Sequence, residues 1–436
     1  MSSKVQASCP ALLIAAPASG QGKTTVTAAL ARFHRRRGLR VRVFKTGPDF
    51  IDPTIHELAS GYPAYQLDLW MVGEEACQSL LFDAAEEADL ILIEGVMGMF
   101  DGTPSSADLA KRFGIPIVAV IDAGAMAQTF GALCFGLSHY DVDLTVAGVV
   151  ANRVASERHE QLLRESLRPE TRLLAVVPKQ AEITMPERHL GLQLAQEQSD
   201  LTQRLDVAAD LLAGSEFEHL PETVTFYKPQ AASENSSRSL KGRRIAIARD
   251  AAFAFVYPAN IDALNDLGAE LQFFSPLRDE RVPDCDALYL PGGYPELHAQ
   301  KLSENTGMIA SIREVIERVP CLAECGGMLY LLNSLTDRDQ HRSQLCGVID
   351  TSAIVNSKVA GLGSLKATLQ NYEVRGHTFH YSSLHSDPGF SSRCRSNLTG
   401  RETEGIYQQG KLLASYAHWY FPSNIEWVAS FFGDDG

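Results

Sequence analysis

The first half of the chain alternates short apolar runs with longer stretches whose apolar residues recur every three or four positions. Short apolar runs of this kind predict strands buried on both faces, and the longer stretches predict helices. The expected strands span residues 11–16, 41–44, 89–93, 115–121, 146–150 and 172–177, and two of the helices span 25–37 and 127–138. This alternation is typical of an α/β domain whose parallel sheet is covered by helices on both sides.

A second domain is expected beyond a change in composition. Residues 221–242 are rich in Ser, Pro, Asn and Lys and lack apolar periodicity, which is typical of a linker. After it, strands are expected over residues 244–248, 271–274, 287–290, 319–323 and 411–416, and helices over 261–267 and 328–335. We therefore predict two α/β domains, spanning residues 1–220 and 243–436.

The composition leads us to expect a cytoplasmic protein of two or three domains. The chain has 436 residues, 45% hydrophobic and 21% charged, with no apolar run of membrane-spanning length and no secretory signal at its start. Its eight scattered cysteines are expected to be reduced thiols. The net charge of -14 argues against nucleic acid or an acidic membrane as a partner, and base rates favour a homodimer.

A glycine-rich loop, Pro-Ala-Ser-Gly-Gln-Gly-Lys-Thr at residues 17–24, joins the first expected strand to the first helix. In such a loop backbone N–H groups bind phosphates, Lys23 reaches the outer phosphates and the Thr24 hydroxyl binds Mg²⁺. Pro17 departs from the usual pattern, which begins with Gly, and an incidental turn is the alternative. The expected nucleotide-binding residues are Ser19, Gly20, Gln21, Gly22, Lys23, Thr24, Thr25 and, after a later strand, Asn152.

Acidic residues follow two further strands. Asp49 and Asp52 come after the strand at 41–44, and Glu94 comes directly after the strand at 89–93. Ligands bind at the carboxyl ends of strands in such sheets, so Asp49 and Glu94 are candidate Mg²⁺ ligands beside Thr24. On local grounds the two aspartates fit turn-forming residues equally well.

Other polar residues are candidates for binding or activating a substrate carboxylate. Lys45 and Asp52 lie in the segment that follows the strand at 41–44. Arg188 and His189 lie in the segment Met-Pro-Glu-Arg-His-Leu-Gly at residues 185–191, for which a cluster of loop salt bridges is the alternative.

Cys325 lies in Ala-Glu-Cys-Gly-Gly, between an expected strand and an expected helix. A cysteine on such a turn is presented as a nucleophile, and the N–H groups of Gly326 and the next glycine face the oxyanion that forms. Gly292 and Gly293 follow another strand and are expected at the same oxyanion. A buried structural cysteine is the alternative.

A cysteine nucleophile needs a base that takes its proton. His418, which follows the apolar run at 411–416, is the best candidate, and we expect it at the carboxyl end of that strand. His377 and His380 are rival candidates, and for each histidine a hydrogen-bonded structural role is the alternative.

Ten motifs occur along the chain in a fixed order. They are APASGQGKTT, FKTGPDFIDP, EGVMGMFDG, PERHLGL, ARDAAFAF, FFSPLRD, LPGGYPE, AECGGM, RGHTFHYS and ASYAHWYF. In this order they resemble the cobyrinate and hydrogenobyrinate a,c-diamide synthases, glutamine-dependent amidoligases of corrinoid biosynthesis, over nearly the whole chain. The resemblance implies a dethiobiotin-synthetase-like ATP domain followed by a class I, triad-type glutamine amidotransferase domain.

The resemblance also implies a reaction. ATP with Mg²⁺ would phosphorylate carboxylates of a corrinoid macrocycle, and ammonia from L-glutamine would displace the phosphate. Roles are implied for Lys23, Thr24, Asp49, Asp52 and Glu94 at the ATP site and for Cys325 and His418 at the glutamine site. Two residues past His418, where other class I amidotransferases carry a carboxylate, this chain has Tyr420. Cobyrinate-type members resemble this chain in lacking that acid.

Hydrogenobyrinate, the metal-free macrocycle, is the expected substrate, and cobalt-containing cobyrinate is the first alternative. A nickel-sirohydrochlorin diamide synthase and a cobyric acid synthase are alternatives among related amidoligases. A P-loop regulatory ATPase joined to a degenerate amidotransferase-like module is the alternative from another class, and it predicts no glutaminase activity.

Overall fold

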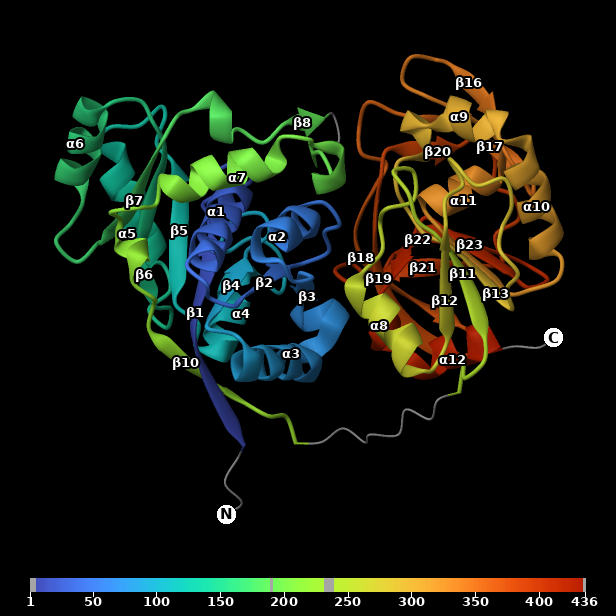
Figure 1. Cartoon of the computed structure of the whole chain (residues 1–436), viewed down its shortest axis with the longest axis horizontal. Helices are drawn as coiled ribbons and strands as arrows, with labels where there is room; N and C mark the ends of the chain where they lie inside the picture. Colours follow the sequence, from blue (N-terminus) through green and yellow to red (C-terminus); the bar gives the residue numbers. More distant parts are fainter. Residues whose placement is uncertain (1–4, 189–190, 231–238, 434–436) are drawn as a thin grey trace. The chain divides into compact units, whose positions relative to one another are not determined.

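The computed structural model divides the chain into two compact units, residues 1–232 and 233–436. It describes residues 5–188, 191–230 and 239–433. Each unit is built around its own sheet, as the colours from blue to green and from yellow to red show in Figure 1.

The sheet of the first unit has the strand order β3-β2-β4-β1-β5-β6-β7, and these strands are parallel. They are β1 (Gln6–Ala15), β2 (Val41–Thr46), β3 (Tyr65–Leu67), β4 (Leu90–Glu94), β5 (Ile117–Asp122), β6 (Val146–Val154) and β7 (Leu173–Pro178). All five residues of β4 are buried, because helices cover both faces of the sheet. Since β2, β4 and β1 are neighbours, the segments that follow them meet at one edge of the sheet.

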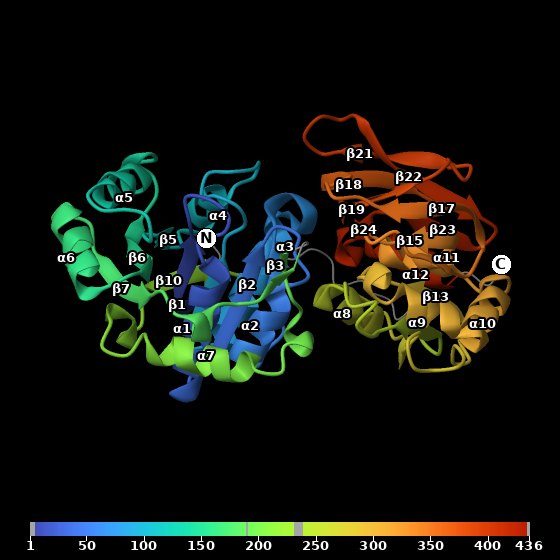
Figure 2. The ribbon, with the colours of Figure 1, turned by 90° about the horizontal axis from the view of Figure 1, so that it is seen from above.

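Helices lie on both faces of this sheet (Figures 1 and 2). On one face α1 (Lys23–Arg36), α2 (Asp52–Ser60) and α7 (Leu201–Asp210) pack together over alternate buried residues of the strands. On the other face lie α3 (Glu74–Glu87) and α4 (Ser106–Phe113), while α5 (Thr129–His139) packs against α6 (Glu157–Ser166). This arrangement agrees with the predicted α/β sheet.

Strand β10 (Thr223–Tyr227) differs from the prediction that residues 221–242 form a linker. It pairs antiparallel with the first half of β1, and its alternate residues Val224 and Phe226 are buried. The other three residues face solvent, which explains why the segment has a polar composition. These residues therefore belong to the sheet of the first unit.

The described part of the second unit contains a sheet in the order β12-β11-β13-β14-β23-β22-β21-β18-β19-β24. Neighbours from β12 to β23 are parallel, and neighbours from β23 onward are antiparallel. The strands are β11 (Arg244–Ala248), β12 (Glu270–Phe274), β13 (Ala287–Leu290), β14 (Cys321–Glu324), β18 (Gly361–Leu369), β19 (Tyr372–His380), β21 (Ser392–Ser396), β22 (Glu402–Gln409), β23 (Leu412–Ser415) and β24 (His418–Trp419). A smaller sheet is formed by β16 (Arg342–Gln344), β15 (Leu332–Thr336), β17 (Ile349–Val355) and β20 (Ser382–Leu384).

Helices also cover both faces of the larger sheet. A core with α10 (Thr306–Ile316) and α11 (Gly326–Leu331) forms on one face, and a core with α8 (Pro258–Asp266) and α12 (Ile425–Gly433) forms on the other. A short helix, α9 (Ala299–Glu304), precedes α10.

The helix predicted over residues 328–335 is wrong beyond Leu331. The chain leaves α11 there and enters β15, which pairs with β17. A short apolar run fits a buried helix and a buried strand equally well, so only the pairing with β17 distinguishes the two.

The eight cysteines are free thiols, in agreement with the expectation from their scattered positions. Within the described ranges, no helix combines the length and the apolar character that a membrane crossing requires.

Candidate functional site

The phosphate loop of the first unit follows β1 and ends at Gly22, which has a left-handed conformation with φ of 94°. A Cβ on Gly22 would lie 2.1 Å from Nδ2 of Asn152, whose amide donates to the Gln21 carbonyl at 2.8 Å. The Gln21 side chain in turn accepts the N–H of Asp122 at 2.8 Å. The structure therefore places Asn152 against the loop, where it holds the loop's shape, and leaves residues 18–20 exposed at the tip.

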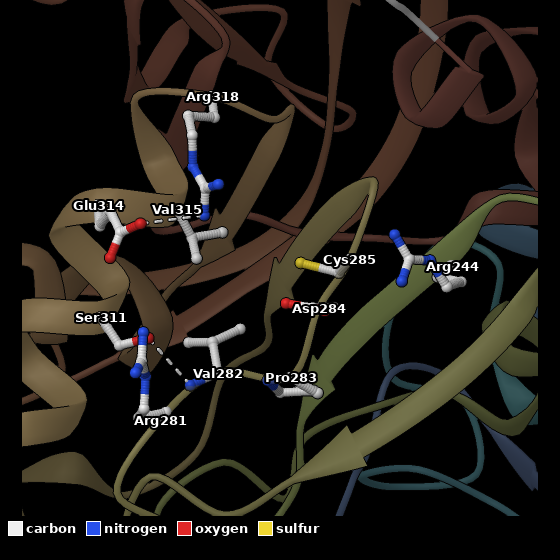
Figure 3. A pocket seen from close by; sticks show the side chains of 10 residues that line it. All are labelled: Arg244, Arg281, Val282, Pro283, Asp284, Cys285, Ser311, Glu314, Val315 and Arg318. Carbon is white, nitrogen blue, oxygen red and sulfur yellow. Dashed lines mark hydrogen bonds and ion pairs between the residues drawn. The ribbon is translucent and has the colours of Figure 1, made fainter.

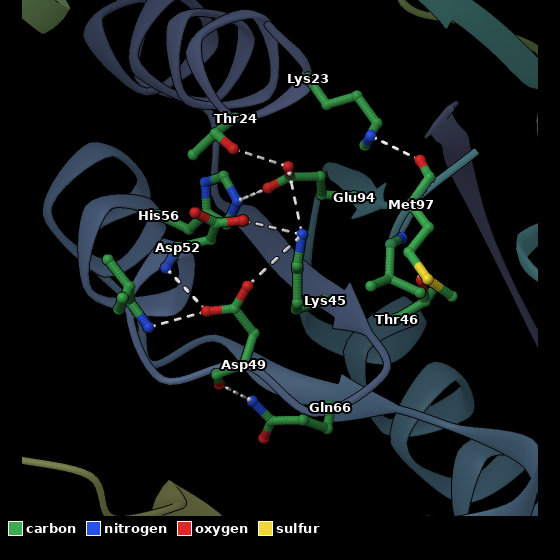
Figure 4. Close-up of polar contacts among 12 residues, drawn as sticks. Lys23, Thr24, Lys45, Thr46, Asp49, Asp52, His56, Gln66, Glu94 and Met97 are labelled. Carbon is green, nitrogen blue, oxygen red and sulfur yellow. Dashed lines mark hydrogen bonds and ion pairs between the residues drawn. The ribbon is translucent and has the colours of Figure 1, made fainter. Parts of the chain in front are cut away.

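Helix α1 begins with Lys23, which is buried, and with Thr24 and Thr25, which are half-buried. Lys23 Nζ donates to the carbonyl of Met97 at 2.7 Å, and Thr24 Oγ1 donates to Oε1 of Glu94 at 2.8 Å (Figure 4). Burial and then the charge of Lys45 lower the pKa of Lys23. The loop thus brings an ammonium group and a hydroxyl to the carboxyl end of β4.

Lys45, which is buried, lies at the centre of a cluster of three carboxylates, of which Glu94 is buried and Asp49 and Asp52 are half-buried (Figure 4). Its Nζ is 2.8 Å from Asp52 Oδ2, 3.2 Å from Glu94 Oε1 and 3.8 Å from Asp49 Oδ2. Lys45 on β2 and Glu94 on β4 are direct neighbours in the register of the sheet. Burial lowers the pKa of Lys45, but the three carboxylates outweigh burial and raise it, so this lysine is a cation.

Asp49 has the turn-forming role that the sequence analysis considered, and its role as a Mg²⁺ ligand stays a prediction. Its Oδ1 accepts the N–H groups of Ile51 at 2.8 Å and of Asp52 at 3.1 Å, as a turn-forming aspartate does. Its Oδ2 also faces Lys45. Burial and the neighbouring Asp52 raise the pKa of Asp49 to about 8.

His56, which the sequence reasoning did not single out, completes this cluster. It is fully buried in α2, and its Nε2 forms a hydrogen bond with Oε2 of Glu94. Burial alone would raise the pKa of Glu94, but Lys45 and His56 outweigh it and lower the pKa to about 2. One sequence signal was available, because His56 follows Asp52 by four residues and shares its face of the helix.

The donor atoms of this cluster fit the proposed Mg²⁺ site. Thr24 offers a hydroxyl, and Asp49 and Glu94 offer carboxylate oxygens, which are the hard ligands that Mg²⁺ prefers. Thr24 Oγ1 and Glu94 Oε1 are 2.8 Å apart at the first turn of α1, where a nucleotide's phosphates bind in such loops.

The predicted basic pair lies at the limit of the described chain. Arg188 is in the two-residue strand β8 (Glu187–Arg188), which pairs with β9 (Gly191–Leu192). His189 lies outside the described residues.

Cys325 in the second unit lies on the turn between β14 and α11, where the sequence places it. Its backbone has φ of 43° and ψ of -104°, a strained conformation for a residue with a side chain. The Cys325 N–H donates to the carbonyl of Ser415 at 2.7 Å, and its own carbonyl accepts the N–H of Leu329 at 2.9 Å. A nucleophile elbow has this combination of strain and anchoring.

Three predicted glycines come together at this turn because each allows a close approach. A Cβ on Gly326 would lie 2.9 Å from the backbone nitrogen of Gly293. A Cβ on Gly292 would lie 2.2 Å from Cε1 of His418. The turn after β13 therefore lies between the elbow and the imidazole ring, and the oxyanion role of these glycines stays a prediction.

His418 is the histidine that the structure places at this turn. It does not end β23, as expected, but begins the separate strand β24, which pairs antiparallel with β19. His377 lies opposite it in that pairing, and the two rings stack at 4.9 Å with an interplanar angle of 16°. His380 instead approaches Glu404 at 3.1 Å.

Glu324, the residue before Cys325, was also missed from the sequence. It is 1% exposed, and its Oε1 accepts the backbone N–H of Trp419 at 3.0 Å while its Oε2 accepts the Tyr289 hydroxyl at 2.8 Å. Burial raises its pKa to about 8, although both donors act in the opposite direction. An acidic residue at the end of an apolar strand is a signal in the sequence, because a buried carboxylate needs partners.

The thiol and the imidazole are both neutral in this arrangement. Burial, followed by the charge of Glu296, raises the pKa of Cys325. Burial, followed by His377, lowers the pKa of His418 well below its usual range. A neutral imidazole has a free electron pair on one ring nitrogen, which is the form that a general base needs.

Comparisons with known proteins agree with this division of the chain. Residues 12–192 match the model of the CobQ/CobB/MinD/ParA nucleotide binding domain, and residues 244–425 match that of the CobB/CobQ-like glutamine amidotransferase domain. The hydrogenobyrinate a,c-diamide synthase of Pseudomonas aeruginosa is 55% identical over 98% of this chain and 98% of its own length. The chain belongs to the cobyrinate and hydrogenobyrinate a,c-diamide synthase family.

Other members of the a,c-diamide synthase family are also similar over nearly their whole length. The hydrogenobyrinate a,c-diamide synthase of Stutzerimonas stutzeri is 56% identical over 95% of this chain and 96% of its own. The cobyrinate a,c-diamide synthase of Herminiimonas arsenicoxydans is 48% identical over 94% of each. These matches confirm the predicted pair of α/β domains, an ATP domain followed by an amidotransferase domain. A solved structure of PurLQS from Thermotoga maritima, at 12% identity over 44% of this chain and 94% of its own, has a TM-score of 0.28, too low to support an argument.

A separate cavity of about 150 Å³ lies at the other end of the strands in the second unit. Figure 3 shows its lining residues, which are Arg244, Arg281, Val282, Pro283, Asp284, Cys285, Ser311, Glu314, Val315 and Arg318. Arg244 opens β11 and Cys285 precedes β13, whereas Cys325 follows the carboxyl end of β14. The cavity is therefore not part of the cysteine site.

Proposed function

We propose that this chain is an ATP- and glutamine-dependent amidoligase that converts the a- and c-side-chain carboxylates of hydrogenobyrinate into amides, as part of cobalamin biosynthesis. The observation that carries the proposal is the 55% identity to a hydrogenobyrinate a,c-diamide synthase over 98% of the chain. The two clusters support it, because activating a carboxylate and releasing ammonia from glutamine require different chemistry.

In the first unit, an oxygen of the substrate carboxylate attacks the γ-phosphorus of ATP and forms an acyl phosphate and ADP. The loop N–H groups and Lys23 hold the phosphates, and Lys45 offers a buried cation near the reacting carboxylate. Thr24, Asp49 and Glu94 would hold Mg²⁺, which neutralises phosphate charge when bound. Ammonia then displaces the phosphate, giving the amide, inorganic phosphate and a proton.

In the second unit, the Cys325 thiol transfers its proton to His418, and the sulfur attacks the side-chain amide carbon of glutamine. The N–H groups of Gly293 and Gly326 stabilise the oxyanion. Protonated His418 then donates to the leaving nitrogen, which releases ammonia and leaves a thioester on Cys325. Water, deprotonated by His418, hydrolyses this thioester to glutamate.

The replacement Cys325→Ser tests this assignment. We expect the variant to lose amidation with glutamine and to retain amidation with a high concentration of ammonium chloride, because the ATP site is unchanged. The measurement is amide formation on hydrogenobyrinate by mass spectrometry. Retention of glutamine use would exclude Cys325 as the nucleophile, and loss of both activities would indicate a structural cysteine.

The macrocycle itself is tested by comparing substrates. The wild-type protein is assayed with ATP and glutamine on metal-free hydrogenobyrinate and on cobalt-containing cobyrinate, and we expect the higher kcat/KM with hydrogenobyrinate. A higher kcat/KM with cobyrinate would support the alternative that cobyrinate is the substrate. The 48% identity to a cobyrinate a,c-diamide synthase is the reason to test it. If neither is amidated while ATP is hydrolysed, the proposed function is wrong.

A further inference from the structure

Other class I amidotransferases carry a carboxylate two residues past the histidine that corresponds to His418. Tyr420 stands at the position two residues later, where its N–H donates to the Arg375 carbonyl at 2.9 Å and its ring packs against Tyr257 at 5.6 Å. Tyr420 has no carboxylate that could orient the imidazole. The position of His418 relative to the nucleophile depends on contacts of the strand that carries it.

The two strands that carry Cys325 and His418 are not neighbours in the sheet. Strand β14 carries the elbow and β24 carries His418, and five strands stand between them in the order of the sheet. The sheet nevertheless curls far enough for Glu324, at the end of β14, to accept the N–H of Trp419 in β24. That N–H belongs to the peptide bond that follows His418, so the contact joins residues adjacent to both members of the pair.

We propose that Glu324 is the positioning residue that sets His418 against Cys325, through its hydrogen bond to the backbone of β24. This inference rests on the proposed function, since it assigns a task within glutamine hydrolysis. Glu324 acts on the backbone of β24 and not on the imidazole itself. It is therefore a positioning residue, and its two carboxylate oxygens form a bridge from Trp419 to the Tyr289 hydroxyl on β13.

Other contacts limit the remaining freedom of His418. Strand β19 holds its backbone in register, and a Cβ on Gly376 of that strand would lie 2.1 Å from the His418 carbonyl oxygen. The ring itself lies between Gly292 and the stacked ring of His377. These contacts define the orientation of the ring. The hydrogen bond between Glu324 and Trp419 connects the strand of His418 to β14, which leads into the nucleophile.

The cost of burying this carboxylate argues for such a specific role. Burying a carboxyl group is unfavourable in either protonation state unless its oxygens are hydrogen-bonded, and apolar residues of similar size often stabilise a core more. Glu324 is 1% exposed, and the structure pairs it with two neutral donors and no cation among its hydrogen bonds. Position 324 therefore requires a side chain that accepts hydrogen bonds from both the Trp419 N–H and the Tyr289 hydroxyl.

Three variants of the full chain separate positioning from folding. Glu324→Gln keeps an oxygen for Trp419 and an N–H for the Tyr289 oxygen, so its kcat for glutamine hydrolysis should fall less than about tenfold. Glu324→Met accepts no hydrogen bond, and a displacement of about 1 Å should lower kcat about 100-fold with little change in KM. Tyr289→Phe is the matched control, because it loosens the same carboxylate but leaves the Trp419 contact, and it should behave like Glu324→Gln.

A second measurement reports on the reactivity of the Cys325 thiol. The rate at which iodoacetamide alkylates Cys325, measured from pH 6 to 9 by peptide mass spectrometry, depends on how well His418 takes the thiol proton. The rate near neutral pH should fall in Glu324→Met and recover in Glu324→Gln, while thermal unfolding identifies any variant that fails to fold. If Glu324→Met does not fold, Glu324→Asp replaces it, since a carboxylate one methylene shorter does not reach Trp419.

Several results would overturn the proposal. These are a wild-type kcat in Glu324→Met or Glu324→Asp, equal losses in the Gln and Met variants, or a loss in Tyr289→Phe as large as in Glu324→Met. Failure of the proposed function would look different, because the wild-type protein would then release no ammonia from glutamine.

Discussion

The replacement Gly292→Ala tests whether the His418 ring works where the structure places it. The added Cβ would lie 2.2 Å from Cε1 and 2.9 Å from Nδ1 of His418, whereas ordinary van der Waals contact begins at 3.4 Å. The ring must therefore retreat by about 1.2 Å, or the turn after β13 must open. Gly292 has no positive φ, so alanine introduces this contact without backbone strain.

The expected loss follows from that displacement. A catalytic group misplaced by about 1 Å lowers the rate of an enzyme about 100-fold, which corresponds to about 2.7 kcal/mol in the activation free energy. The kcat for glutamine hydrolysis by Gly292→Ala should fall by this factor. The free energy of unfolding should fall by about 1–3 kcal/mol, the usual range for an overpacked site.

Glutamate release measures the glutaminase activity, and amidation with ammonium chloride measures the ATP site, which should be unaffected. Gly136→Ala is the matched control, because nothing lies within 4 Å of the Cβ position at this glycine of α5. It should retain wild-type rates of both reactions. A Gly292→Ala protein with wild-type glutaminase activity would refute the position of the ring.

Three further predictions concern buried charge. Lys45→Met leaves Asp52 and Glu94 without their shared cation, so its free energy of unfolding in urea should be about 3–5 kcal/mol lower than that of the wild type. Added Mg²⁺ should raise the free energy of unfolding of the variant more than that of the wild type. Removing the hydrogen bond to Glu94 in His56→Phe should weaken Mg²⁺-dependent nucleotide binding about 10–100-fold in a fluorescence titration, and unchanged Mg²⁺ dependence would contradict this role. Burial lowers the pKa of His377 to about 3, so the stability of its neutral form is present above the unfolded pKa of about 6.5 and is lost as the pH falls toward 3. When the pH is lowered from 8 to 5, the free energy of unfolding in urea should therefore fall by about 2 kcal/mol less in His377→Gln than in the wild type. Equal falls in the two proteins would show that His377 does not cause the pH dependence.

Much of the fold was predictable because its central strands are buried on both faces. The apolar runs at 41–44, 89–93 and 287–290 correspond to β2, β4 and β13, the last of them residue for residue. Strand β10 was not predictable, since its alternation of buried and exposed residues is short and its partner lies more than 200 residues earlier in the chain. Segments of this kind acquire their structure from pairing, which local sequence does not encode.

The candidate sites divide in the same way. Residues within motifs, such as Lys23 and Cys325, were placed by the strand-loop-helix context that gives those motifs their chemistry. The contacts of His56 and Glu324 were not, because they connect residues 38 and 95 positions apart in the sequence. Each is buried and polar, so each needs a partner, but only the fold shows which partner it has.

Both sites end an apolar strand with a buried glutamate, and the neighbours give the two carboxylates different tasks. Glu94 faces Lys45 and His56, whose charge and hydrogen bond outweigh burial and keep it an anion. Glu324 faces the Trp419 N–H and a tyrosine hydroxyl, so its value lies in accepting hydrogen bonds and not in its charge. Glu94→Gln should therefore lower amidation with ammonium chloride about 100-fold, the scale on which the loss of one preorganised electrostatic group acts, whereas Glu324→Gln should keep most of its glutaminase activity. If Glu94→Gln keeps as large a fraction of its amidation rate as Glu324→Gln keeps of its glutaminase rate, the charge of Glu94 is not used.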